Sequence, residues 1–287
     1  MADKATMERL RDKVYEYRKD ILQLCYKAKG MHVGGDLSCA EVIVTLYEYV
    51  MRIDPQNPSW EDRDRFVISK GHGGAALYLV MAMRGYFGKE ELLATYKGHE
   101  TRFGMHPCKT LCPELDSSSG SLGHGLPIAT GMALAGRLNK KSYRTFCMVG
   151  DGEMMEGAIW EAAMAAAHYK LGSLIVILDR NRLCLDGFTE EIMGVEPVAG
   201  KWQAFGWNAI VIDGNNLKEV MDVFDHLPVP ESGVPTAIIS QTVKGKGVSF
   251  MENNPAYHHA VINDEQFRQA IEEIEAAYQQ TKGGAKA

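Results

Sequence analysis

The sequence predicts an α/β domain of three layers, in which helices cover both faces of a doubly wound, mainly parallel sheet. From residue 120 onward, helical segments alternate with short strands, which is the pattern of successive β-α-β units. The strands at 145–149 and 173–178 are continuous apolar runs, as expected for strands buried on both faces. The length of 287 residues suits a single domain over 1–287, and no repeat or linker divides it.

The first 120 residues are expected to form helices around one strand. Apolar residues recur at helical spacing from Leu10 to Ala28, and Ser38 with Glu41 forms a capping-box pattern that starts another helix. A loop as long as 98–119 is uncommon inside a compact domain, and such loops tend to be functional. The expected order is helix 10–28, loop 30–36, helix 41–51, strand 65–69, helix 75–86 and loop 98–119.

The second part of the chain is expected to supply four more strands and the helices between them. The predicted elements are helix 123–138, strand 145–149, helix 153–170, strand 173–178, strand 208–212, helix 216–227, strand 236–240 and helix 264–280. The last of these helices is amphipathic, and residues 281–287 after it are expected to be a frayed tail.

Composition and charge argue against several classes of protein. Lys and Arg total 31 against 37 for Asp and Glu, and no long basic run offers a surface to nucleic acid or to an anionic membrane. No apolar run approaches the roughly 18–20 residues of a membrane span, and the charged N-terminus lacks the apolar core of a signal peptide. Six Cys are too few for a disulfide scaffold, so the chain is predicted to be cytoplasmic with reduced thiols.

Two polar motifs follow consecutive strands of the second part. The strand at 145–149 ends in a Gly-Asp-Gly turn centred on Asp151, and the strand at 173–178 leads to Asn181. In a right-handed β-α-β unit the carboxyl ends of both strands lie at one edge of the sheet. Asp151 and Asn181 are therefore expected to open onto one crevice, which is the usual ligand site of such sheets.

The chemistry of these two residues favours a divalent cation and a phosphate. One carboxylate, one amide oxygen and a nearby carbonyl suit Mg²⁺ or Ca²⁺ and leave positions for phosphate oxygens. The helix expected to begin at Glu153 would offer the N–H groups of 152–154 to a phosphate, and the flanking glycines allow close approach. Diphosphate held through Mg²⁺ is the resulting hypothesis, and a purely structural pair of turns is the alternative.

The segment from Gly150 to Asn181 resembles the thiamine diphosphate motif, in which Gly-Asp-Gly is followed about 30 residues later by Asn. Four further segments resemble those of transketolases. They are G-M-H-V-G-G at 30–35, S-K-G-H at 69–72, G-S-L-G-H-G at 120–125 and K-G-K-G at 244–247, followed by Tyr257-His258. The similarity covers nearly the whole chain, in order. It implies the thiamine diphosphate-binding fold (PP domain) and the N-terminal half of a split, two-subunit transketolase.

The resemblance implies a role for each matched residue. The metal ligands would be Asp151, Asn181 and the carbonyl of Leu183, with Mg²⁺ as the ion and Ca²⁺ or Mn²⁺ as substitutes. The cofactor contacts would be His72, Gly120, Ser121, Leu122, Gly150, Asp151, Gly152, Asn181, Lys244 and His258. The catalytic groups would be His32, His72, His106, His258 and Glu156.

Each histidine is compared with the family pattern separately, because nine His allow accidental matches. His106 lies 14 residues before Gly120, as in the family, whereas His99 has the wrong spacing. His258 is followed by His259 where the family usually has Gly, so which ring reaches the site stays open. Hydrogen bonding to ketose hydroxyls and proton transfer at carbonyl oxygens are the expected work of these imidazoles.

His106 with Cys108 and Cys112 could instead form part of a zinc site, since C-x₃-C is an allowed spacing, but no fourth ligand is close in sequence. The role of the two Cys is left open.

The resemblance implies a transferase of carbohydrate metabolism, specifically of pentose phosphate metabolism. The enzyme would move a two-carbon ketol unit from a ketose to an aldose. The sugar could be phosphorylated, branched or sulfonated. One alternative is the α subunit of a thiamine diphosphate-dependent 2-oxo acid dehydrogenase, and another is an inert scaffold or regulatory subunit. The expected partner is a second transketolase subunit with the pyrimidine-binding and C-terminal domains, in an α2β2 heterotetramer.

Overall fold

The structure, a computed structural model, describes residues 3–283 and has the predicted α/β architecture. Five strands form one sheet in the order β1-β2-β3-β5-β4, and every neighbouring pair is parallel. The strands are β1 (Arg65–Ile68), β2 (Thr145–Gly150), β3 (Leu174–Arg180), β4 (Asn208–Asp213) and β5 (Thr236–Gln241). Each lies within about two residues of the strand that the sequence predicts.

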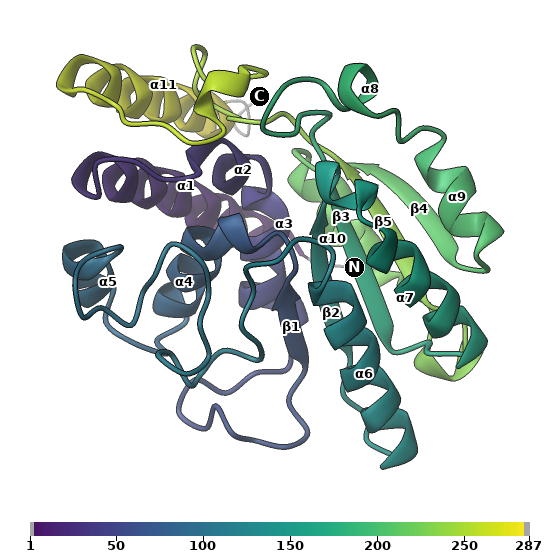
Figure 1. Cartoon of the computed structure of the whole chain (residues 1–287). Helices are drawn as coiled ribbons and strands as arrows, with labels where there is room; N and C mark the ends of the chain where they lie inside the picture. The colour runs from purple at the N-terminus through teal and green to yellow at the C-terminus, as the bar shows by residue number, and fades with distance from the viewer. Residues whose placement is uncertain (1–2, 284–287) are drawn as a thin grey trace.

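Helices cover both faces of this sheet (Figure 1). The α-helices are α1 (Lys4–Lys27), α2 (Val33–Ser38), α3 (Ala40–Thr45), α4 (Gly74–Met83), α5 (Lys89–Thr95), α6 (Gly125–Leu138), α7 (Gly157–His168), α8 (Thr189–Ile192), α9 (Val198–Ala204), α10 (Leu217–Asp225) and α11 (Asp264–Gly283). Alternate residues of each strand enter two separate cores. Ile177 and Ile238 pack toward α1, α3, α4 and α10, whereas Val176 and Ala237 pack toward α6, α7 and α9. Among the described residues, none of these helices has the length and apolar character to cross a membrane.

The region expected to be a loop at 30–36 is partly helical. Helix α2 begins at Val33, and α3 follows it after a single residue, Cys39. The capping-box prediction for Ser38 is wrong, because α3 has no side-chain cap. The Ser38 hydroxyl instead donates to the carboxylate of Asp179 at 2.7 Å, a partner 141 residues away.

The helix predicted to start at Glu153 starts later. Residues Gly152–Met155 form a single 3₁₀ turn, and α7 begins at Gly157. The cause is the side chain of Glu153, whose buried carboxylate accepts the N–H groups of Gly150 and Gly123 at 2.9 and 2.8 Å. The backbone after the Gly-Asp-Gly turn is therefore held against β2, and the predicted start of the helix at Glu153 is wrong.

The ends of two other elements also differ. Helix α5 at Lys89–Thr95 was not predicted, and α11 extends through Gly283, three residues into the segment expected to fray. The remainder of that segment, 284–287, lies outside the described residues.

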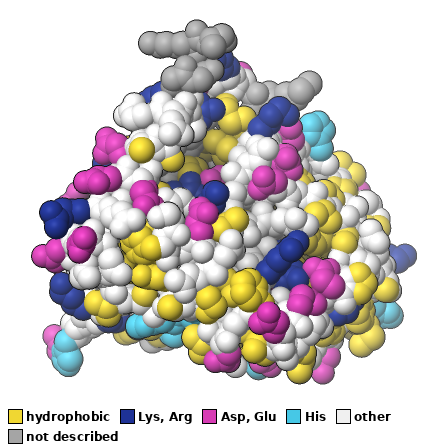
Figure 2. All heavy atoms as spheres, turned by 90° about the horizontal axis from the view of Figure 1, so that it is seen from above, with side chains coloured by type: hydrophobic (Ala, Val, Ile, Leu, Met, Phe, Trp, Pro, Cys, Tyr) yellow, Lys and Arg dark blue, Asp and Glu magenta, His cyan; other side chains and the backbone are white. Residues whose placement is uncertain are grey.

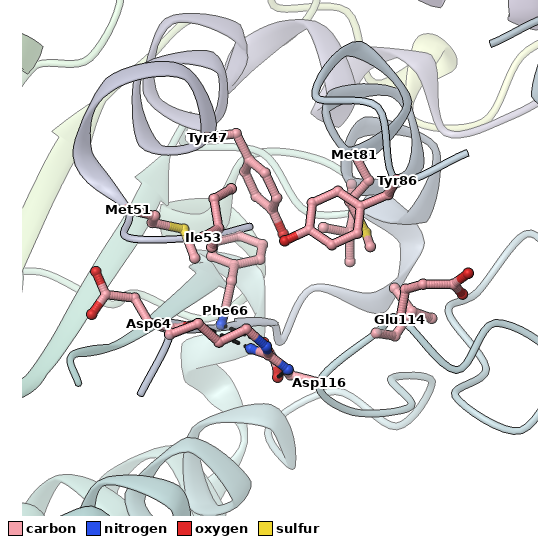
Figure 3. A pocket seen from close by; sticks show the side chains of 12 residues that line it. Tyr47, Met51, Ile53, Asp64, Phe66, Met81, Tyr86, Glu114 and Asp116 are labelled. Atoms are coloured by element: carbon pink, nitrogen blue, oxygen red, sulfur yellow. Dashed lines mark hydrogen bonds and ion pairs between the residues drawn. The ribbon is translucent and has the colours of Figure 1, made fainter. Parts of the chain in front are cut away.

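The long loop at 98–119 has no helix or strand, but a carboxylate fixes its end to the sheet. Asp116 accepts from the guanidinium of Arg63 at 2.6 Å and from the backbone N–H of Phe66, in β1, at 2.8 Å. Figure 3 shows Asp116 beneath the rings of Tyr47 and Tyr86. The side chains of Arg63 and Asp116 are each only 11% exposed, so the pair is largely shielded from water.

We predict that Asp116→Ala lowers the free energy of unfolding by about 3 kcal/mol or more, because the substitution leaves a shielded guanidinium without its partner. Glu61→Ala is the matched control, since Glu61 pairs with Lys141 at 3.1 Å but is 82% exposed. Its cost should not exceed about 1 kcal/mol. Urea unfolding measures both, and equal losses would contradict the anchoring role of Asp116.

Candidate active site

The two sequence motifs lie side by side at the carboxyl edge of the sheet. Gly150 at the end of β2 pairs with Asp179 in β3, so the residues that follow are neighbours. The carboxylate of Asp151 accepts from the backbone N–H of Arg182 and from the guanidinium of Arg180, the latter at 3.1 Å. Asp151 and Asn181 are both buried. The β-α-β interpretation of the sequence therefore placed this pair correctly.

A second carboxylate, Asp179, joins four chain segments beneath this edge. Its oxygens accept from Lys70 at 2.7 Å, from Ser38 at 2.7 Å, from Asn181 at 3.0 Å and from Thr242 at 2.5 Å. Burial acts to raise the pKa of Asp179, but the Lys70 ammonium and the hydroxyls of Ser38 and Thr242 hold it below the ordinary value. Asp179 is therefore an ionised group that orients Asn181 through its amide.

The partner of Asp179, Lys70, is equally buried and lies in the S-K-G-H segment. Its ammonium also donates to the carbonyl of Gly35 at 2.7 Å, which brings the G-M-H-V-G-G segment to the same point. Burial acts to lower the pKa of Lys70, but Asp179 raises it above the ordinary value. His72 follows two residues later, so this ion pair sets where its ring lies.

Glu153 links three of the matched segments. Besides the N–H groups of Gly150 and Gly123, its carboxylate accepts the hydroxyl of Ser69. Burial raises the pKa of Glu153. Sequence reasoning missed this residue, although a carboxylate two positions after Asp151, next to free N–H groups of a glycine turn, was an available signal. Glu153 is a positioning residue for the loops around the site.

Lys244 connects the predicted metal ligands to the histidines. Its ammonium donates to the carbonyls of Leu183 and Cys184 at 3.2 and 3.3 Å and lies 2.8 Å from Nδ1 of His258. Burial lowers the pKa of Lys244 to about 8, despite the opposing field of Asp151. A cation of this chain thus already contacts the Leu183 carbonyl that the resemblance assigns to a metal.

The structure brings the four predicted histidines together. The ring centroid of His32 lies 5.4 Å from those of His72 and His258 and 5.8 Å from that of His106. His259 is part of the same cluster, 5.0 Å from His32, but it is exposed. His258 is the ring that meets Lys244 and also lies 5.1 Å from His72, which favours it over His259 as the inner residue.

The imidazoles of His32, His72 and His258 are neutral near pH 7. Burial lowers the pKa of His32 to about 4 and that of His258 to about 3, and the neighbouring imidazoles and Lys244 add to the effect. The pKa of His72 lies well below the ordinary value for the same reasons. Nδ1 of His32 is buried and has no hydrogen-bond partner among the described residues. The cluster therefore offers uncharged rings that can each donate or accept one hydrogen bond.

Four predicted site residues are exposed outside the histidine cluster, and we call their positions the rim of the site: Gly120, Ser121, Leu122 and Glu156. Gly120, Ser121 and Leu122 are exposed in the loop before α6. Glu156 is exposed as the residue that precedes α7, and among the described residues its carboxylate has no hydrogen-bond or ion-pair partner. The structure of this chain does not bring Glu156 to the histidine cluster.

The oxygen atoms at the Asp151 edge fit a divalent cation held with phosphate. Burial, with Asp179 nearby, raises the pKa of Asp151 to about 6, so its carboxylate stands to gain from a cation. Arg180 supplies one here, and its guanidinium also pairs with Glu190 and Glu196 at 3.0 Å each. The sequence did not predict this role of Arg180. Asp151, Asn181 and the Leu183 carbonyl are the hard donors that Mg²⁺ prefers.

The zinc alternative has no support in residues 3–283, where no group of three or more His, Cys, Asp or Glu is placed to hold a metal. Cys112 bonds instead to Glu114 and Arg102.

Comparison with known proteins points in one direction. Residues 12–280 match the family model for the transketolase thiamine diphosphate binding domain. The chain is 41% identical over 257 residues to one of the subunits of the apulose-4-phosphate transketolase of Phocaeicola vulgatus, covering 90% of both chains. It is 43% identical over 258 residues to a 6-deoxy-6-sulfo-D-fructose transketolase subunit of a Clostridium species, covering 90% of this chain and 93% of the other.

Longer relatives match over part of their length. Human transketolase is 35% identical over 281 residues, which are 98% of this chain and 44% of the human protein. Among solved structures, transketolase of Campylobacter jejuni superposes with a TM-score of 0.86 at 26% identity, covering 93% of this chain and 43% of that one.

We predict that Lys244→Met raises the pKa of His258 from about 3 toward its ordinary value, because a neighbouring cation disfavours the imidazolium form. The ring of His258 stays buried in this variant, so its pKa will return only partly to the ordinary value. Titration of the ring signals by NMR measures the change. Lys246→Met is the control, since Lys246 pairs with Glu252 at 3.3 Å. An unchanged His258 titration in a folded Lys244→Met protein would show that the 2.8 Å contact is not formed in solution.

Proposed function

The chain belongs to the transketolase family, and on that premise we propose that it is the thiamine diphosphate-binding, N-terminal subunit of a two-subunit transketolase. The reaction is transfer of a two-carbon ketol unit from a ketose to an aldose. Two relatives that are named as transketolase subunits have nearly the same length as this chain, which supports the division into subunits.

One observation carries the assignment. Lys244 contacts both the Leu183 carbonyl, at the edge that holds Asp151 and Asn181, and the ring of His258. The edge proposed to hold Mg²⁺ and the cluster of imidazoles thus meet at one buried ammonium. A diphosphate on one side of Lys244 and a sugar on the other is the arrangement that this geometry favours.

The binding half of the site is assigned to hard oxygens and cations. Asp151, Asn181 and the Leu183 carbonyl would hold Mg²⁺, and Lys244 would hold the diphosphate. When bound, thiamine diphosphate supplies the carbanion that takes up and releases the two-carbon unit. Asp179 fixes the Asn181 amide through the 3.0 Å hydrogen bond, so the ligand set is oriented before anything binds.

The reacting half is assigned to His32, His72, His106 and His258. Because the rings of His32, His72 and His258 are neutral near pH 7, each can accept a hydrogen bond from a ketose hydroxyl or donate one to a carbonyl oxygen. Nδ1 of His32 has no hydrogen-bond partner among the described residues, and this unused position supports a role for His32 in binding substrate. Glu153 and Lys70 hold the loops that present these rings.

We assign the pyrimidine end of the cofactor and the sugar's anionic end to a partner subunit. Glu156 and the residues Gly120–Leu122 are exposed at the rim, where a second chain could complete the site. An α2β2 heterotetramer is the simplest closed assembly, because such oligomers usually close about a two-fold axis. All six Cys are free, which supports work in a reducing cytoplasm.

We predict that this chain alone has no ketol-transfer activity at any Mg²⁺ or cofactor concentration, and that activity appears on mixing with the partner subunit. The measurement is ketose-to-aldose transfer in a coupled dehydrogenase assay, with a 2-oxo acid as the parallel substrate. Turnover of the 2-oxo acid alone would support the dehydrogenase alternative. No turnover, together with no heat-stabilisation by thiamine diphosphate and Mg²⁺, would support an inert scaffold. Steady turnover by the isolated chain would contradict the split enzyme.

We predict that Asp151→Ala, assembled with the partner, lowers thiamine diphosphate affinity in the presence of Mg²⁺ more than about 100-fold, or about 2.8 kcal/mol. The reason is that water cannot replace the charge of the only carboxylate in the proposed ligand set. Calorimetry measures the affinity, and Asp62→Ala, at a half-exposed residue that pairs with Lys141, is the control. Unchanged affinity in the Asp151 variant would refute the metal assignment.

A further inference from the structure

A deep groove lies apart from the histidines, between α1, α11, the start of α10 and the turn at Lys246-Gly247 after β5. Its volume is about 700 Å³, within the range of sites that hold small ligands. Figure 2, which looks onto the molecule from above, shows a hollow with hydrophobic and basic side chains on its walls. The proposed reaction does not use this groove, although Lys246 and Gly247 at its edge belong to the K-G-K-G segment.

One wall of the groove is apolar and firmly built. Tyr15 of α1 stacks on Tyr278 of α11 with ring centroids 3.9 Å apart and planes at 8°. Val14 and Ile274, from the same two helices, are buried beside them. A planar or apolar group of a ligand can therefore lie against a surface whose shape is already set.

The groove is also lined by positive charge. Four cations line the groove, Arg11, Arg18, Lys218 and Lys246, against one carboxylate, Glu41. Lys218 and Lys246 pair with acids outside the lining, at 2.6 and 3.3 Å, whereas Arg11 has no carboxylate partner among the described residues. Of the four lining cations, Arg11 is thus the one without a carboxylate partner among the described residues, which leaves it available to an anion.

Arg18 differs from the other three cations, because it is a buried arginine with an N–H group that makes no hydrogen bond to the described residues. Only 8% of the residue is exposed, and its single ion-pair partner among the described residues is Glu41 at 2.8 Å. Glu41 is itself shared, since it also accepts from the amide of Asn215 at 3.2 Å. Nε of Arg18 is buried without an acceptor in the part of the chain that the structure describes. Burying a guanidinium that is only partly satisfied is costly, which favours an anion nearby.

The charge does not come from the end of a helix. Asn216 caps α10 with its own side chain, which accepts from the N–H groups of Lys218 and Glu219. The helix N-terminus therefore has little left to offer a ligand, and the side chains carry the affinity.

From these observations we propose that the groove is a second ligand site, which binds a small anionic molecule with a planar or apolar body. The anion, a phosphate or a carboxylate, would lie on Arg11 and Lys218, and the body would lie along Tyr15 and Tyr278. This site goes beyond the proposed transferase activity and does not depend on it.

The groove is connected to the cofactor edge through Asn215. Its amide donates to the carbonyl of Ser38 at 3.0 Å and accepts from the N–H of Val243 at 2.9 Å. Val243 precedes Lys244, and Ser38 bonds to Asp179. A ligand in the groove thus touches a residue that holds two parts of the active site, so occupancy of the groove provides a route by which an anion could regulate the enzyme.

The test uses 1-naphthyl phosphate as the probe, because it combines a planar apolar body with one phosphate. We expect saturable 1:1 binding to the full chain by calorimetry, weakened at least tenfold in the double variant Arg11→Glu/Lys218→Glu. The neutral probe 1-naphthol should also bind at least tenfold more weakly than the phosphate. Lys27→Glu, on an exposed residue of α1 outside the groove, is the matched control and should change the affinity less than twofold.

A second variant separates the groove from the cofactor site. Lys244→Met removes the ammonium of the proposed diphosphate site, so groove binding should persist in it. Loss of binding in Lys244→Met with retention in Arg11→Glu/Lys218→Glu would place the probe at the cofactor edge and overturn the proposal. Absence of binding to the unmodified chain up to millimolar probe would overturn it as well. Because the readout is binding and not turnover, failure of the proposed reaction leaves this test intact.

Discussion

The buried ion pair between Lys70 and Asp179 is the interaction on which the rest of the site depends. Both side chains are about 1% exposed, and they join residues 109 positions apart at 2.7 Å. Desolvating two charges is costly, so the pair persists only because further hydrogen bonds satisfy it. Those bonds come from Ser38, Asn181 and Thr242 on Asp179 and go to Gly35 from Lys70. Four chain segments that carry or adjoin candidate site residues are thereby joined to the Lys70–Asp179 ion pair.

The pKa values of the groups around this ion pair depend on which cation has a carboxylate partner. Lys70 is neutralised by a carboxylate, but Lys244 meets only carbonyls and an imidazole at hydrogen-bond distance among the described residues. Burial without a paired carboxylate lowers the pKa of Lys244 to about 8, and the histidines around it stay uncharged. The site is thus polar and buried, and its Lys244 ammonium is better matched to an incoming anion than to a neutral ligand.

The sequence predicted the sheet and the neighbouring positions of Asp151 and Asn181, because apolar runs and strand order are local signals. It did not predict the 3₁₀ turn after Asp151, the true partner of Ser38 or the role of Arg180. Each of these depends on a contact that local pattern does not encode, such as the hydroxyl of Ser69 on Glu153, 84 residues away. The sequence between 152 and 156 favours a helix, but the contacts of the Glu153 carboxylate with Ser69 and Gly123 hold it in a 3₁₀ turn.

The position of Glu153 has a consequence for how such a protein can change. The carboxylate of Glu153 holds the segments that contain Ser69, Gly123 and Gly150. These three segments therefore cannot be exchanged independently of one another. A loop transplanted from a relative would function only if it brought the same hydroxyl or N–H group to the same carboxylate. Diversity in the sugar accepted should therefore accumulate in segments that Glu153 does not touch, such as the loop at 98–119.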